Sequence, residues 1–144
     1  MSFNFPPHGT YSLKISNNII VARLAGSWNK ECAQNYAQDF KSTAHPLSHQ
    51  SWGHLVYLDD WGLGVPEITP IIQELVDWCT HNGLKKSAQI YCQSMTKRYS
   101  LDKMIIDRCD DFERQIFADE LSAISWLDLS GFTLSPSNES SVPV

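Results

Sequence analysis

The sequence predicts one α/β domain, in which helices pack on a mixed five-stranded sheet. Three observations predict this class. The apolar run from Leu55 to Leu58 is short and uninterrupted, which is typical of a central parallel strand that is covered on both faces. A hairpin pattern precedes this run, and segments with helical and strand periods alternate after it. A length of 144 residues suits a single domain with its own core.

The predicted order is β-β-α-β-α-β-α-β-α, and it begins with an antiparallel hairpin. Apolar and polar residues alternate from Tyr11 to Ile15, which indicates a strand with one solvated face. The pair Asn17-Asn18 follows, and asparagine tolerates the positive φ of a two-residue turn. The second strand is therefore expected from Ile19 to Leu24.

The first helix is predicted to start from a cap provided by Ser27, because Gly26 and Ser27 end the second strand. Its apolar positions recur with a helical period and share one face: Trp28, Cys32, Ala33, Tyr36, Ala37 and Phe40. The segment from His45 to Gly53 contains a proline, polar residues and a glycine, which predicts a loop. Trp52 is thereby expected in a loop, where a large aromatic side chain is hard to bury.

A second helix follows the central strand. Thr69 is predicted to cap it, with Pro70 at the first helical position, where a missing N–H does no harm. Asn82-Gly83 supplies a left-handed stop. The buried stripe of this helix is expected to be Ile71, Ile72, Leu75, Val76, Trp78 and Cys79.

Four further elements complete the order. A buried strand is predicted over 87–92, and a helix follows it. Residues 112–117 are predicted to form an edge strand, because charged and polar residues interrupt its apolar positions. Asp119 then caps the last helix, which runs through Leu121, Ile124 and Leu127. The helix after the buried strand is based on Met95, Tyr99, Met104 and Ile105.

The domain is expected over residues 10–132, after an N-terminal segment, 1–9, and before a disordered tail, 133–144, which is rich in serine and has little to bury. The N-terminus lacks a cationic leader with an apolar stretch, and no run approaches the roughly 18 apolar residues of a membrane span. The four cysteines form no Cys-x-x-Cys pair, which favours free thiols in a reducing compartment. We therefore expect a cytoplasmic protein without stable membrane insertion.

The charge and the motifs exclude several function classes. A net charge of −5 disfavours nucleic acid and anionic membranes as partners. The pair Gly62-x-Gly64 lacks the third glycine and the lysine of a nucleotide-binding loop, and we expect no cofactor.

The predicted binding site is the segment that follows the central strand, which we call the crest loop. It lies at the carboxyl end of that strand, where open α/β sheets usually bind ligands. Trp61, Leu63 and Val65 are expected to supply contact area, and Asp59 and Asp60 charge selectivity. An equally open alternative for Trp61 is a lid folded back over the core. The residues of the crest loop are Asp59, Asp60, Trp61, Gly62, Leu63, Gly64 and Val65.

Several motifs resemble those of one family. The sequence from Phe117 to Leu127 is similar to a family ending in which a strand's Phe precedes an acidic cap and an Ala-x-x-Trp-Leu helix. Shorter matches are Leu24-Ala25-Gly26-Ser27, Val56-Tyr57-Leu58-Asp59 and Ala88-Gln89-Ile90-Tyr91. On these residues and on element order, the chain from Gly9 to Phe132 resembles the STAS fold family, of the anti-sigma-factor-antagonist type, and in particular its SpoIIAA-like branch of small bacterial proteins. The resemblance implies the same fold and a regulatory binding role.

The segment from Gly62 to Val65 also resembles the family's Asp-Ser-Ser-Gly-Leu-Gly-Val loop, at which antagonist members are switched by serine phosphorylation. In this alignment the two serine positions hold Asp60 and Trp61. The resemblance therefore does not extend to a phosphorylation switch.

The favoured function is a non-enzymatic binding module for a protein partner or a small apolar ligand. The alternative is a small hydrolase or metal-dependent enzyme using His54, Asp59 and Asp60, although consecutive residues of an extended chain point to opposite faces and the two acids cannot flank one substrate. The series His45, His49 and His54 raises the possibility of zinc, but its proline-containing loop gives this spacing no specificity. A third alternative is a homodimer that shares the crest loop between chains.

Overall fold

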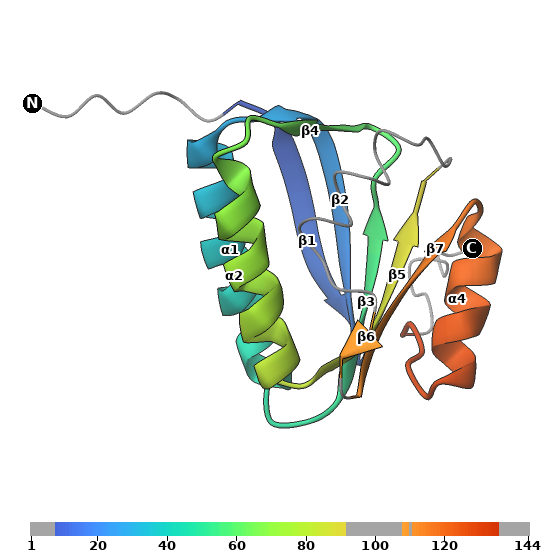
Figure 1. Cartoon of the computed structure of the whole chain (residues 1–144). Coiled ribbons are helices and arrows are strands. Elements are labelled where there is room, and N and C mark those ends of the chain that lie inside the picture. The colour runs from blue at the N-terminus through green and yellow to red at the C-terminus, as the bar shows by residue number, and fades with distance from the viewer. Residues whose placement is uncertain (1–7, 92–107, 110, 136–144) are drawn as a thin grey trace, which may run out of the picture.

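The computed structural model describes residues 8–91, 108–109 and 111–135. It is a mixed α/β sheet with α1 and α2 on one side and α4 on the other (Figure 1). Strands lie in the order β1-β2-β3-β5-β7-β6, and β4 pairs with β2 beside this path. The elements are β1 (Thr10–Ser16), β2 (Ile19–Trp28), α1 (Lys30–Ala44), the 3-10 helix η1 (His45–Leu47), β3 (Trp52–Tyr57), β4 (Trp61–Gly64), α2 (Ile68–His81), β5 (Leu84–Ile90), β6 (Arg108–Cys109), β7 (Phe112–Phe117) and α4 (Glu120–Leu129).

The predicted fold class is confirmed. The five predicted strands correspond to β1, β2, β3, β5 and β7, and the described residues add the short strands β4 and β6. Strand β3 pairs in parallel with β2 on one side and with β5 on the other, as expected for the apolar run at Leu55. Strand β7 was expected at the edge, but β6 pairs antiparallel with its beginning.

The hairpin prediction is also confirmed. Strands β1 and β2 pair antiparallel in an unbroken register from Ser16–Ile19 to Thr10–Ala25. Asn17 adopts a φ of 56°, the left-handed conformation that its short polar side chain tolerates.

The predicted start of the first helix was wrong. Strand β2 continues through Trp28, because β4 pairs with its end, and Asn29 caps α1 instead of Ser27. The Asn29 side chain accepts a hydrogen bond of 3.0 Å from the backbone N–H of Cys32. The predicted apolar stripe is nevertheless buried: Cys32, Ala33, Tyr36, Ala37 and Phe40.

Trp52 was wrongly expected in a loop. It opens β3 and is fully buried, while the short helix η1 occupies the first part of the predicted loop. Burial is favourable because the indole Nε1–H donates a 2.8 Å hydrogen bond to the carbonyl of Asn82, so that its polar atom is paired.

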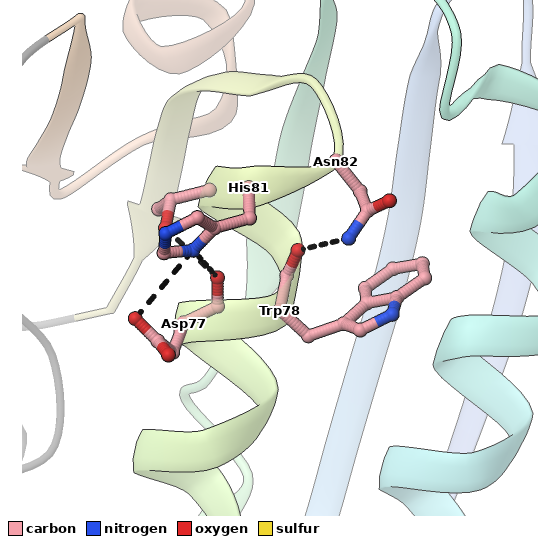
Figure 2. A network of polar contacts seen from close by, with 5 residues as sticks. Asp77, Trp78, His81 and Asn82 are labelled. Carbon is pink, nitrogen blue, oxygen red and sulfur yellow. Dashed lines mark hydrogen bonds and ion pairs between the residues drawn. The ribbon is translucent and has the colours of Figure 1, made fainter.

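Helix α2 starts slightly earlier than predicted. Glu67 takes the N-cap position without a side-chain hydrogen bond, and Pro70 lies in the first turn. The predicted stop is confirmed, since Gly83 has a φ of 105° and β5 begins directly after it. Figure 2 shows the polar contacts of the last turn, in which the Asn82 side chain donates to the Trp78 carbonyl at 2.7 Å. In the same turn His81 Nδ1 lies 2.7 Å from the carbonyl oxygen of Asp77.

Helix α4 begins as predicted. The Asp119 carboxylate accepts a 2.8 Å hydrogen bond from the backbone N–H of Ser122, and this bond lowers the pKa of Asp119. The predicted helix based on Met95 to Ile105 and residues 136–144 of the predicted tail lie outside the described residues. Residues 133–135 of the predicted tail are described. Thr133 and Ser135 form hydrogen bonds with Asn17 and Ser16 at the β1–β2 turn.

Two hydrophobic clusters hold the layers together. One joins α1 and α2 to the sheet and contains Phe40, Trp52 and Trp61. The other joins α4 to the opposite face through Leu55, Ala88 and Leu127. Within residues 8–91, 108–109 and 111–135, no helix has the length and apolarity needed to cross a membrane.

Candidate functional site

The crest loop does not project freely from the end of β3. After Leu58 the chain turns at Asp59 and Asp60 and then runs as β4 alongside the end of β2. The backbone N–H of Gly26 donates a 3.0 Å hydrogen bond to the carbonyl of Asp60, and that of Val65 donates at 3.1 Å to the carbonyl of Trp28. Both ends of the loop are thus fixed to β2.

The two glycines of the crest loop permit this close pairing. A Cβ atom added to Gly64 would lie 2.2 Å from the carbonyl oxygen of Trp28, and one added to Gly62 would lie 2.8 Å from Ser27 Oγ. Neither distance allows a methyl group without movement of a neighbour. Backbone packing therefore requires a glycine at Gly64, whereas a side chain at Gly62 would first displace the Ser27 hydroxyl.

Trp61 is buried, with 3% of its surface exposed. Its ring meets that of Trp28 edge to face, with centroids 5.3 Å apart and an interplanar angle of 71°. Of the two expectations for this side chain, the structure supports the lid on the core. Trp61 is not a surface contact residue, and the role expected for the Leu63 side chain lies outside what the structure describes.

Asp59, Asp60 and Val65 of the crest loop are exposed, Val65 to 41%, and so are Gly62 and Gly64. The two acids line an open groove of about 520 Å³, which we call the crest groove. Its other walls come from the β1–β2 hairpin and the end of β3: Thr10, Tyr11, Ser12, Arg23, Leu24, Ala25 and Tyr57.

Strand register explains this grouping. Ser12 pairs with Arg23, and Arg23 pairs with Tyr57, so these three side chains form a row across one face of the sheet. Helix α4 packs mainly on β5, β7 and β3. On β2 its cluster buries Ile19 and Val21, whereas Arg23, further along that strand, and Ser12 and Lys14 of β1 are exposed.

The floor of the crest groove is polar and partly charged. The guanidinium carbon of Arg23 lies 3.8 Å from the centroid of the Tyr57 ring, within the range of a cation–π interaction. Burial, and then the charge and hydrogen bond of the Glu120 carboxylate, raise the pKa of Tyr57, while Arg23 acts in the opposite direction. Tyr57 is thus a neutral phenol at pH 7, held between a cation and an anion.

His54 points to the other face of the sheet. Its ring meets Phe40 of α1 edge to face at 5.2 Å, and its Nδ1 lies 3.1 Å from Ser87 Oγ on β5. Burial lowers the pKa of His54 to about 4, so the imidazole is neutral at pH 7. His54 is therefore on the opposite side of β3 from the crest groove, and the structure does not bring it together with Asp59 and Asp60.

The three histidines of the series are not brought together either. His45 and His49 are exposed beside η1, whereas His54 is interior. Among the described residues, no group of three or more His, Cys, Asp or Glu side chains is placed to hold a metal ion.

Sequence reasoning missed Arg23 and Tyr57 as groove residues. Arg23 is the one charged residue in the predicted strand from Ile19 to Leu24, which indicates an exposed position, but its place beside Tyr57 depends on the strand register. His54 and Tyr57 are three residues apart on β3. Residues separated by an odd number of positions in a strand lie on opposite faces, so these two side chains point in opposite directions.

Comparisons with known proteins agree with this architecture. No protein-family model and no curated protein matches the sequence. A crystal structure of an uncharacterized protein of the DUF3478 family from Shewanella loihica PV-4, described as having a SpoIIAA-like fold, matches with a TM-score of 0.61 at 14% identity. The match covers 88% of this chain and 98% of that one. The chain therefore has the SpoIIAA-like α/β fold that its motifs resemble.

Proposed function

We propose that the protein is a non-enzymatic binding module, which recognises a basic, extended segment of a partner protein through the crest groove. The observation that carries this proposal is the exposed pair Asp59 and Asp60, which line an open groove of about 520 Å³ together with residues of the β1–β2 hairpin.

The charges in the crest groove favour a cationic segment. Asp59 and Asp60 outnumber the single cation of the lining, Arg23, whose guanidinium lies over the Tyr57 ring, and Glu120 lies beside the Tyr57 hydroxyl. The net charge of −5 adds a long-range attraction for a basic partner.

The arrangement gives little support to the enzyme alternative. Its proposed imidazole, His54, lies on the opposite face of the sheet and is kept neutral by burial. A general base must be within hydrogen-bond reach of the reacting group, which this geometry does not provide for His54 and the two acids.

Binding of fluorescent ten-residue peptides, rich either in lysine and arginine or in glutamate, tests the proposal. Basic peptides are expected to bind the parent protein with an affinity that falls as salt rises. The double variant Asp59→Asn/Asp60→Asn should weaken that binding about fivefold, the size expected for two partly exposed ion pairs. Fluorescence anisotropy measures both effects.

A matched control removes two exposed carboxylates elsewhere. Asp77→Asn/Asp128→Asn changes the net charge equally but leaves the crest groove intact, and it should retain parental affinity. If the two double variants weaken binding equally, only overall charge matters and the crest groove is not the site. Equal binding of basic and acidic peptides by the parent protein would also remove the proposal.

A further inference from the structure

A second feature lies inside the molecule, on the other face of the sheet from the crest groove. A cavity of about 70 Å³ lies between the sheet and helices α1 and α2. Most of its lining is apolar, for example Phe40, Val56 and Leu75, and none of the described residues that line it carries a charged side chain. An uncharged, mainly apolar occupant is the only kind that such a lining accommodates well.

Two buried nitrogen atoms in this lining have no hydrogen-bond partner among the described residues. They are Nε1 of Trp61 and Nε2 of His54. Buried polar side-chain atoms in native proteins are nearly always paired, and exceptions call for an explanation. That these two nitrogens line the same cavity points to a partner molecule inside it.

The two nitrogens define the chemistry of that partner. The indole Nε1 of Trp61 is a donor only, so its partner must offer an acceptor atom. The imidazole of His54 is neutral, and its Nδ1 is already engaged with Ser87 Oγ at 3.1 Å, which leaves Nε2 to donate or accept according to the tautomer. A hydroxyl oxygen satisfies either nitrogen, and a carbonyl oxygen satisfies the indole.

We propose that this cavity is a binding site for a small, uncharged, mostly apolar molecule that carries one hydroxyl or carbonyl oxygen. Its size sets the class of ligand. A cavity of about 70 Å³ holds roughly five non-hydrogen atoms, by comparison with the 10–15 Å³ that one water requires. Short-chain alcohols and ketones fit this description. The site is independent of the proposed recognition of a basic segment, which uses the opposite face.

The test is a titration of the full chain with 1-butanol and 2-butanone, followed through the indole N–H signals in a ¹⁵N–¹H correlation spectrum. One indole signal is expected to shift with saturation, and it should be the signal that disappears in Trp61→Phe. Butyrate and butylammonium, of similar size but charged, should give no saturable shift. Because these ligands are small, affinities in the millimolar range are expected.

Two valine variants localise the site. Val56→Ile adds one methylene to the cavity lining and should weaken 1-butanol binding at least fivefold. Val21→Ile adds the same group to the buried cluster under α4 and should leave binding unchanged.

Three outcomes would overturn the proposal. A shift that rises linearly with ligand concentration would mean a solvent effect, and no shift at all would mean that only water enters. Both are read from the parent protein and do not depend on whether a variant folds. Unchanged affinity in a folded Val56→Ile protein would place the binding elsewhere.

Discussion

The two faces of the strands β2 and β3 differ sharply, although consecutive residues of the same strands supply both. On the side of α1 and α2, His54, Val56 and Leu58 line a mainly apolar cavity. On the other side, Arg23 and Tyr57 line an open groove together with Asp59 and Asp60. Alternation along the strands thus places an apolar pocket under α1 and α2 and a charged groove on the other face.

Removing the indole of Trp61 is expected to destabilise the core between the sheet and helices α1 and α2. Trp61→Ala should lower the free energy of unfolding by about 3–5 kcal/mol, because it deletes a buried aromatic side chain that packs on Trp28. Urea denaturation measures the change. The control Val65→Ala, four residues along and 41% exposed, should change stability by less than about 0.5 kcal/mol. Equal effects of the two substitutions would contradict the burial of Trp61.

A methyl group at Gly64 should disrupt the pairing of β4 with β2. Gly64→Ala is expected to destabilise by about 2–3 kcal/mol, because the new Cβ meets a backbone carbonyl at 2.2 Å. Gly62→Ala should have a smaller effect, since its nearest neighbour is the movable Ser27 hydroxyl at 2.8 Å. Thermal unfolding followed by circular dichroism compares the two, and the reverse order would be inconsistent with the pairing of β4 and β2.

Lowering the pH should reduce the stability of the protein, because the buried imidazole of His54 disfavours protonation. The pKa of this residue falls from 6.5 to about 4 on folding, so the unfolded chain binds the proton more readily than the folded one. The neutral imidazole therefore contributes stability that is present above pH 6.5 and is lost progressively as the pH falls towards 4. Between pH 7 and pH 5 the loss should be about 2 kcal/mol.

Comparison of urea unfolding for the parent protein and His54→Gln isolates this contribution. The variant lacks the titrating group, so its stability should fall less between these two pH values. The same pH dependence in both proteins would show that His54 is not the responsible group.

Substitutions in the crest groove should have only small effects on stability. Arg23→Gln removes the cation above Tyr57 and should lower stability by only about 0.5–1 kcal/mol, as for an exposed cation–π pair. It should also bring the pKa of Tyr57 higher still, since Arg23 opposes the effect of Glu120. Spectrophotometric titration of the phenol detects that shift. Lys14→Gln, on the same face, is the control and should affect neither quantity.

Much of the fold could be predicted from local sequence patterns. Alternation from Tyr11 to Ile15, the Asn17-Asn18 turn and the Asp119 cap each act within a few residues, and each was found as predicted. The helix α1 stripe was also correct, although its first residue, Trp28, belongs to a strand.

The wrong predictions for Trp52 and Trp61 have a different cause, which is pairing between segments that are distant in the sequence. Trp52 is buried because a carbonyl 30 residues away accepts its N–H. Trp61 is buried because β4 joins β2, and two glycines normally indicate a loop rather than a strand. The candidate site was therefore only partly predictable: Asp59 and Asp60 lie at an accessible margin, whereas the opposite wall, with Arg23, depends on a register that no local pattern encodes.

The contacts of residues 131–135 have a consequence for how the chain folds. Asn17 and Asn18 donate side-chain hydrogen bonds to the carbonyls of Thr133 and Gly131, which are 116 and 113 residues away in the sequence. A hydrogen bond of 2.9 Å joins the hydroxyl groups of Ser16 and Ser135 across 119 residues. These contacts close a loop of nearly the whole polypeptide, and we expect them to form only after the intervening strands have paired. The β1–β2 turn can form early by local interactions, but its contacts with residues 131–135 are expected to be among the last.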